Sequence, residues 1–294
     1  MGENSSIEWT DHTFNPWIGC TKVSPGCANC YAEVQDRRFG YTSGGWGKGK
    51  PRKRTSPANW KKPVQWNKAA AAAGRRAKVF CASLADVFDE EVPALWRESL
   101  FDMIRECQAL DWLLLTKRPG LMKRWFGGNR APDNVWLGVS VEDQKTADER
   151  IPQLLEISAR IHWISYEPAL EGVDFRRWLR CEGDTDGDGN CPRYGHRQAC
   201  PKKLDWIIVG GESGRLDARP FNVAWARSTI AQCDDADVAV FVKQLGTRPI
   251  GVSAADLEMA AVSTRWPHWP TDLKGGNVDE WPGDLRVREY PKNH

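Results

Sequence analysis

Short apolar runs alternate with amphipathic segments along most of the chain. Runs rich in Val, Ile, Leu and Trp predict buried strands over residues 78–82, 112–116, 135–141, 161–165, 206–210 and 238–243. Apolar residues near helical spacing predict helices over residues 31–39, 93–107, 121–126, 146–157 and 223–233. Strands that alternate with helices in this way favour a parallel sheet with right-handed crossovers. We therefore predict an α/β fold, a partial (β/α) barrel of six or seven units.

Changes in composition along the chain divide it into a barrel and an extension. We assign residues 1–250 to the barrel and residues 251–294 to an irregular extension, rich in Trp and Pro, that packs on it. Three segments interrupt the alternation: a cysteine loop at 15–31, a basic loop at 44–68 and a Cys-rich insertion at 176–203.

Polar residues follow nearly every predicted strand. They are Ser83 and Asp86; Thr116, Lys117 and Arg118; Ser140 and Glu142; Tyr166 and Glu167; Gly211, Glu212 and Ser213; and Lys243 and Gln244. Each alone fits a helix cap or a surface charge. Because ligand sites of parallel α/β folds form at the carboxyl ends of strands, the whole set favours a ring around a polar ligand.

Charge adds one local feature to an almost neutral chain. The formal net charge is +2, from 41 basic and 39 acidic residues, so no global field demands a nucleic-acid partner. Residues 48–62, however, hold seven Lys or Arg and no acid, with Trp46 and Trp60 at the edges. This segment could bind the phosphates and bases of a nucleic acid, or it could be a solvated loop without a ligand.

Nothing in the sequence predicts a membrane protein. Residues 1–16 lack the basic and apolar regions of a signal peptide, and no run approaches the ~18 apolar residues that span a bilayer. We expect a soluble, cytoplasmic protein, in the host cytoplasm if a phage encodes it.

Nine cysteines include a compact group, Cys20, Cys27 and Cys30, with the spacing C-x6-C-x2-C. Clustered cysteines in a reducing compartment indicate metal binding rather than disulfides. Three thiolates can hold three irons of a [4Fe–4S] cluster and leave the fourth iron open to S-adenosylmethionine (SAM). Zinc is the alternative, with His12 as the nearest further ligand.

A second group of soft ligands lies in the insertion: Cys181, Cys191, His196 and Cys200. These four side chains fit a structural zinc site, and three of them fit an auxiliary iron–sulfur cluster. The alternative is a surface loop with incidental thiols.

Several stretches together resemble one family. They include IEWTDHTFNPWIGCTKVSPGCANCYAE at 7–33, VFCASLADVFDEE at 79–91, LLLTKRP at 113–119, NVWLGVSVEDQKTADERIP at 134–152, HWISYEPALEGVD at 162–174 and VFVKQLG at 240–246. The resemblance is to a phage- and prophage-associated family that is related to the radical SAM superfamily and has long lacked an assigned function. That superfamily usually carries C-x3-C-x2-C, whereas the first gap here is longer and Asn29 stands at its aromatic position.

The resemblance implies roles for the polar residues. Tyr31, Ser83, Asp86, Ser140, Glu142 and Glu167 would bind SAM, and Lys117, Arg118, Glu212, Lys243 and Gln244 would bind substrate. It implies a radical SAM enzyme that uses an electron donor such as flavodoxin or ferredoxin. Its substrate would be a nucleotide or DNA, with phage thymidine hypermodification by isomerisation of a glycyl adduct as the leading expectation. A lyase that repairs thymine damage and a non-catalytic, zinc-stabilised nucleic-acid-binding module are the alternatives.

Overall fold

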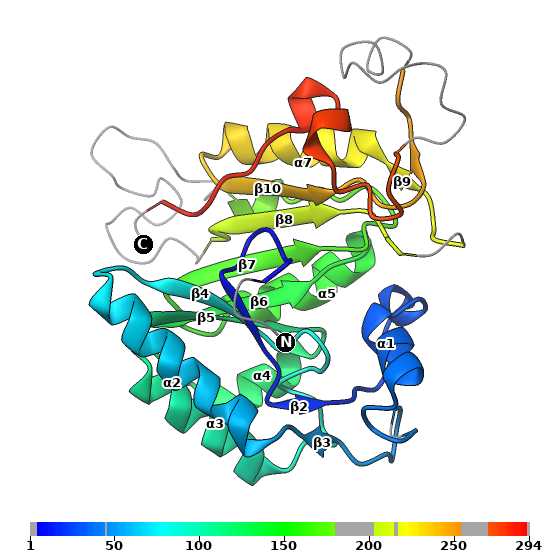
Figure 1. The fold of residues 1–294 in the computed structure, drawn as a ribbon. Helices are drawn as coiled ribbons and strands as arrows, with labels where there is room; N and C mark the ends of the chain where they lie inside the picture. Colours follow the sequence, from blue (N-terminus) through cyan, green and yellow to red (C-terminus); the bar gives the residue numbers. More distant parts are fainter. Residues whose placement is uncertain (1–4, 45, 180–202, 215–216, 254–269, 293–294) are drawn as a thin grey trace, which may run out of the picture. The chain divides into compact units, whose positions relative to one another are not determined.

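A computed structural model describes residues 5–44, 46–179, 203–214, 217–253 and 270–292 (Figure 1). The predicted second metal group, Cys181, Cys191, His196 and Cys200, lies outside these residues. The chain divides into two compact units. The first comprises residues 1–139 and 156–161, and the second comprises residues 140–155 and 162–294.

Both units are built from parallel strands that alternate with helices, which confirms the predicted α/β class. The first unit contains, in order, β1 (His12–Phe14), β2 (Trp17–Ile18), the 3-10 turn Pro25–Cys27, α1 (Tyr31–Phe39), β3 (Lys53–Arg54), α2 (Pro57–Ala72), β4 (Ala77–Cys81), α3 (Ala94–Glu106), β5 (Leu110–Thr116), α4 (Pro119–Phe126) and β6 (Val135–Ser140, whose last residue falls in the second unit). The second contains α5 (Gln144–Leu155), β7 (Ile161–Tyr166, whose first residue falls in the first unit), α6 (Arg176–Leu179), β8 (Trp206–Gly210), β9 (Phe221–Asn222), α7 (Val223–Asp235), β10 (Ala239–Gln244), β11 (Pro249–Ile250) and two 3-10 turns, Val278–Glu280 and Gly283–Leu285.

The first unit has a parallel sheet in the order β1-β4-β5-β6. Its strands are almost wholly buried, and Trp112, Leu113 and Leu114 of β5 have no exposed surface. Such continuous apolar strands require cover, and crossover helices supply it on one face. α2 packs against β4 and β5 (Figure 1). β2 and β3 form a separate antiparallel pair beside the cysteine loop.

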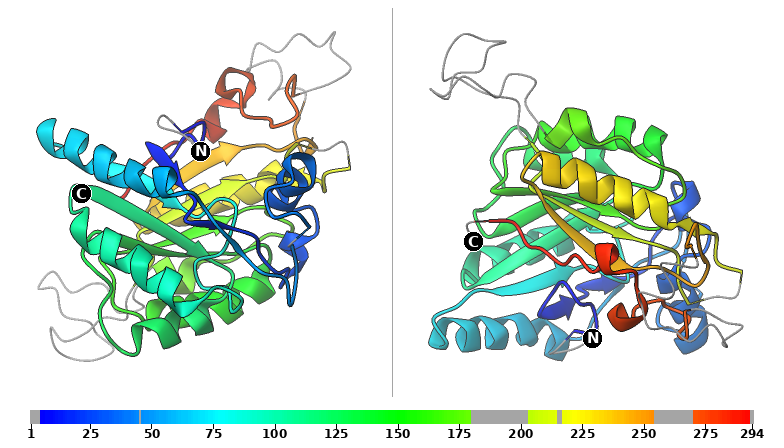
Figure 2. Two further views of the ribbon diagram at one scale, coloured as in Figure 1. Left: turned by 60° about the horizontal axis from the view of Figure 1, so that its bottom comes forward. Right: turned by 90° about the horizontal axis from the view of Figure 1, so that it is seen from above.

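The second unit has parallel strands in the order β7-β8-β10, with α7 packed against β8 and β10 (Figure 2). Asn222 is the N-cap of α7, because its side chain accepts a hydrogen bond from the Ala224 amide. The C-terminal segment lies along β10: the Val242 amide donates to Val287, and the Glu289 amide donates to Val240. Trp281 of this segment is fully buried.

The strands and helices predicted from periodicity are confirmed, with residues 31–39 and 206–210 matching their elements end to end. One prediction is wrong. Residues 57–68, which we expected to continue the basic loop, form most of α2. The Ser56 side chain caps this helix by accepting from the Asn59 amide, Pro57 occupies its first turn, and an alanine run extends it. No helix among the described residues has the length and apolar character needed to cross a bilayer.

Candidate functional site

The cysteine loop leads from β2 into α1. Cys20 lies two residues after the end of β2. Cys27 ends the 3-10 turn that Pro25 begins, and Cys30 stands at the N-cap of α1. All three are free, half-buried thiols. The turn is closed by the Cys27 amide, which donates to the Ser24 carbonyl at 2.9 Å. The predicted spacing thus gives one loop with a turn between its first and last cysteines.

Backbone pairing carries Cys20 to the carboxyl end of the first unit's sheet. The amide of Gly19 donates to the Leu84 carbonyl at 3.1 Å, and Gly19 forms a parallel bridge with Ala85. Leu84 and Ala85 belong to the segment that leaves β4. Cys20 therefore lies beside the residues that follow β4, where parallel α/β folds form their ligand sites.

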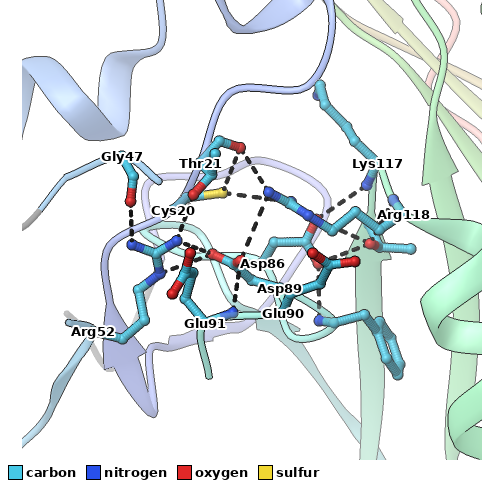
Figure 3. Close-up of polar contacts among 12 residues, drawn as sticks. Cys20, Thr21, Gly47, Arg52, Asp86, Asp89, Glu90, Glu91, Lys117 and Arg118 are labelled. Carbon is cyan, nitrogen blue, oxygen red and sulfur yellow. Dashed lines mark hydrogen bonds and ion pairs between the residues drawn. The ribbon is translucent and has the colours of Figure 1, made fainter. Parts of the chain in front are cut away.

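Arg118, which follows β5, connects this edge to the cysteine loop (Figure 3). One terminal nitrogen lies 3.7 Å from the Cys20 sulfur and 2.9 Å from an Asp86 carboxylate oxygen. The other donates to the Thr21 carbonyl at 2.7 Å. The side chain is only 9 % exposed. We predicted Arg118 as a substrate ligand, but in the structure its guanidinium nitrogens face Cys20, Thr21 and Asp86.

Asp86 organises the ends of β4 and β5. Its carboxylate accepts hydrogen bonds from the Thr116 hydroxyl at 2.7 and 2.9 Å and from the Lys117 amide at 3.2 Å, in addition to the bond from Arg118. It also accepts from the Phe88 amide, two residues on. A buried carboxylate needs such donors. Asp86, Thr116, Lys117 and Arg118 were all predicted as strand-end residues, and the structure brings them together.

A second buried ion pair, between Arg52 and Asp89, supports the first one. The Arg52 guanidinium approaches Asp89 at 2.7 Å and donates to the Thr21 hydroxyl at 2.6 Å (Figure 3). It also donates to the carbonyls of Gly47 and Lys50, each at 3.0 Å. Sequence reasoning missed both residues of the pair. Arg52 stands among six other cations of the basic segment, and only its burial distinguishes it.

Burial and charge set the protonation of this group. Burial, reinforced by Asp86 and opposed by Arg118, raises the pKa of the Cys20 thiol to about 12. Burial also raises the pKa of Cys30, against the opposing effect of the nearby Glu33 and Ala32 amides at the start of α1. Burial disfavours the Arg118 charge, yet Asp86 and the other anionic neighbours outweigh it and raise the pKa of Arg118. Arg118 is therefore a permanent cation beside Cys20.

Tyr31 and Ser83, two of the predicted SAM ligands, meet near the same loop. The Tyr31 hydroxyl donates to the Ser83 carbonyl at 2.6 Å, which ties the start of α1 to the segment after β4. The Ser83 hydroxyl accepts from the Asn15 side chain at 2.9 Å. Asn15 also accepts from the Leu84 amide at 2.7 Å, so it fixes the backbone that carries Ser83.

In the second unit, Glu167, Lys243 and Gln244 form one group. The Lys243 ammonium lies 2.7 and 2.8 Å from the two Glu167 carboxylate oxygens. The Gln244 amide nitrogen donates to Glu167 and to the Gly211 carbonyl, each at 2.9 Å. We predicted Glu167 for SAM and the other two for substrate. Their direct contacts mean that a change in Lys243 or Gln244 also affects Glu167.

The remaining predicted residues of the second unit are held by arginines. Glu142 has no exposed surface and lies 3.1 Å from Arg150, which also donates to the Ser140 carbonyl at 2.7 Å. Glu212 faces Arg219 at 2.5 Å and accepts from its backbone amide at 2.9 Å. These contacts fix the two carboxylates in place.

The donor set of the cysteine loop fits an iron–sulfur cluster. Among the described residues, no three His, Cys, Asp or Glu side chains are grouped as ligands of one metal ion. A [4Fe–4S] cluster makes a different demand, because each thiolate binds its own iron. Three free cysteines on one loop, with Arg118 beside Cys20, are the type of sulfur ligand that such a cluster requires, and they would bind iron as thiolates.

Comparison with known proteins identifies a family without a described activity. The model of the family DUF5131, "Protein of unknown function", matches residues 4–266, and the chain belongs to this family. No curated protein and no solved structure matches the chain.

Proposed function

We propose that this DUF5131 member is a radical SAM enzyme whose [4Fe–4S] cluster is held by Cys20, Cys27 and Cys30. The observation that carries the proposal is the position of Cys20. Backbone pairing from Gly19 to Leu84 sets this thiol beside the carboxyl end of β4, next to Asp86 and Arg118. When bound, the cluster would supply the electron that cleaves SAM to a 5′-deoxyadenosyl radical.

The chain's own residues would bind and orient SAM. Tyr31, Ser83 and Asp86 of the first unit stand within or beside the cysteine-loop contacts, which supports their proposed role. In the second unit we propose Glu167 as a SAM ligand. Ser140 and Glu142, expected from the sequence in the same role, are buried, so they would act only by holding the end of β6 in place. Lys117, Glu212, Lys243 and Gln244 remain the proposed substrate ligands, although Lys243 and Gln244 also position Glu167.

A nucleotide in DNA is the substrate that the basic segment favours. Lys48, Lys50, Lys53, Arg54 and Lys61 are exposed there. The segment is tied to the cysteine loop, because the Gly47 amide donates to the Cys20 carbonyl at 3.0 Å and Arg52 donates to Thr21. Exposed cations bind phosphates without sequence preference. A phosphate chain held here would lie near the proposed cluster.

We propose isomerisation of an amino-acid adduct on thymidine, such as a glycyl group, during phage DNA hypermodification. The 5′-deoxyadenosyl radical would take a hydrogen atom from the glycyl carbon and become 5′-deoxyadenosine, and a hydrogen atom returned to the rearranged adduct would complete the isomerisation. A low-potential flavodoxin or ferredoxin would supply the electron that cleaves SAM. Repair of damaged thymine by a lyase would use the same site, and the products distinguish the two. Liquid chromatography with mass analysis of nucleosides from treated phage DNA should show a new peak that has the mass of the starting adduct and a different retention time. Restored thymidine would instead identify the lyase.

Oxygen-free purification tests the cluster. The wild-type protein should be brown, absorb near 400 nm as iron–sulfur clusters do, contain iron and sulfide, and cleave SAM on reduction. Single Cys20→Ser, Cys27→Ser and Cys30→Ser variants should lose the absorbance and the cleavage. Cys107→Ser is the matched control, because Cys107 is a buried core residue of the same unit. A colourless protein with one zinc per chain would overturn the proposal and favour the nucleic-acid-binding module.

A further inference from the structure

We propose that Arg118 sets the reduction potential of the cluster through its contact with the Cys20 sulfur. This inference rests on the proposed function, because it requires a cluster at Cys20. Arg118 would act as a positioning and tuning residue, not as the substrate ligand that sequence reasoning assigned.

The contacts of Arg118 point toward the cysteine rather than toward solvent. One terminal nitrogen faces the Cys20 sulfur at 3.7 Å, and the other donates to the carbonyl of Thr21, the next residue, at 2.7 Å. A planar guanidinium that holds both a sulfur and the adjacent carbonyl fixes the direction of the N–H···S contact. Its burial leaves it little access to a substrate carboxylate.

Two buried ion pairs lie beside this contact. Arg118 pairs with Asp86 at 2.9 Å, and Arg52 pairs with Asp89 at 2.7 Å (Figure 3). Buried hydrogen bonds hold both pairs in place near Cys20. Hydrogen bonds to the sulfurs, net charge and solvent exposure determine iron–sulfur potentials. Arg118 supplies both a hydrogen bond and a charge, whereas Asp86 supplies an opposing charge.

The direction of the effect follows from charge. One-electron reduction, by the proposed low-potential flavoprotein or ferredoxin, adds a negative charge to the cluster. An N–H donor and a cation at a ligand sulfur stabilise that charge and raise the potential. Loss of Arg118 should therefore lower the potential, and loss of the Asp86 charge should raise it.

Redox titration of the cluster-loaded protein without SAM, followed by electron paramagnetic resonance, tests this inference. In Arg118→Met we expect a tenfold or larger fall in the reduction equilibrium constant, about 59 mV or more for one electron. Asp86→Asn should shift the potential upward. The double variant Arg118→Met/Asp86→Asn restores the wild-type net charge but lacks the N–H···S bond, so it should still lie below the wild type.

Arg105→Met is the matched control, because Arg105 pairs with Asp102 on the surface of α3 in the same unit. It should leave the potential unchanged. If Arg118→Met does not load a cluster, Arg118→Lys replaces it in the test. It keeps the positive charge but lacks the two guanidinium nitrogens that contact Cys20 and Thr21, so its potential should fall by a smaller amount. If neither loads, Arg118→Gln takes their place; it removes the charge and keeps an N–H donor, and its potential should also lie below that of the wild type.

Loaded variants with the wild-type potential would overturn the role of Arg118 and leave the cluster assignment intact. A wild-type protein that takes up no iron and sulfide would instead overturn the proposed function itself.

Discussion

The guanidinium of Arg52 and the carboxylate of Asp89 form an ion pair at 2.7 Å in which both side chains are shielded from solvent. Arg52 comes from the basic segment and Asp89 from the segment after β4, so the pair fastens one to the other. Its bond to Thr21 includes the cysteine loop in the same network.

Replacing Arg52 with Met should destabilise the first unit strongly, because Asp89 would stay buried without its cation. Breaking a buried pair in this way costs about 3–5 kcal/mol. Urea denaturation should show a fall of that size in the free energy of unfolding. Arg105→Met breaks an exposed pair and should cost less than about 1 kcal/mol. Equal losses in the two variants would contradict the structural role of Arg52.

Lys243 and Glu167 should behave as one unit in SAM binding. Since Lys243 contacts both carboxylate oxygens of Glu167, Lys243→Met and Glu167→Gln should each weaken SAM binding about tenfold, a loss of ~1.4 kcal/mol. The double variant should bind no worse than Glu167→Gln, since contacting residues are not additive.

Equilibrium dialysis with labelled SAM measures these affinities, and Lys292→Met, which breaks an exposed pair with Asp237, is the control. At saturating SAM, Lys243→Met should still cleave the cofactor. Additive losses in the double variant would show that Lys243 acts separately from Glu167.

The exposed cations of the basic segment should determine the salt dependence of DNA binding. Lys53→Ala should weaken binding to duplex DNA and reduce the slope of log K against log salt by about 0.9, the value for one phosphate contact. Fluorescence anisotropy at several salt concentrations measures this slope. Lys68→Ala removes an equally exposed lysine near the other end of α2 and should leave the slope unchanged. An identical effect of both variants would exclude a specific role for the segment.

Asp205 should make the second unit less stable as pH rises. Burial raises the pKa of this carboxyl from 3.8 to about 6, although the His162 amide, which donates to it at 2.7 Å, opposes the shift. Between these two values the folded state binds more protons than the unfolded state, so the free energy of unfolding falls as pH rises and stays low above about 6. The shift corresponds to at most about 3 kcal/mol, less the screening by water that reaches this half-buried group.

Urea denaturation at several pH values from about 4 to 7 tests this, with Asp205→Asn as the comparison. The free energy of unfolding of Asp205→Asn should change less with pH than that of the wild type over this range. At neutral pH the variant should be the more stable of the two. Parallel curves would contradict the assignment of the slope to Asp205.

Periodicity predicted most of the fold because its strands are continuous apolar runs and its helices are amphipathic. It missed β1, since His12, Thr13 and Phe14 carry no periodic signal and become a strand only by pairing with Val79, Phe80 and Cys81 of β4. It mistook the first turns of α2 for loop, because the neighbouring cations and Pro63 outweighed the Ser56 cap and the alanines.

The site was predictable in its residue types and not in its pairings. The strand-end rule singled out Asp86 and Arg118, but their contact with Cys20 depends on the bridge from Gly19 to Ala85, which joins residues far apart in the chain. Arg52 could not be told from its exposed neighbours, because sequence does not reveal which cation of a basic run is buried.

The C-terminal segment along β10 has a consequence for solubility. An outer strand offers unpaired amides and carbonyls to any other chain with a strand to add, and natural sheets guard against this by covering the edge. Here the Val242 amide donates to the Val287 carbonyl, and the Val240 carbonyl accepts from the Glu289 amide. The Trp206 indole N–H also donates to the Glu289 carbonyl at 2.9 Å. The C-terminal segment therefore protects the edge of β10 from aggregation. A chain that ends at residue 285 would expose this edge, and we expect it to self-associate through β10.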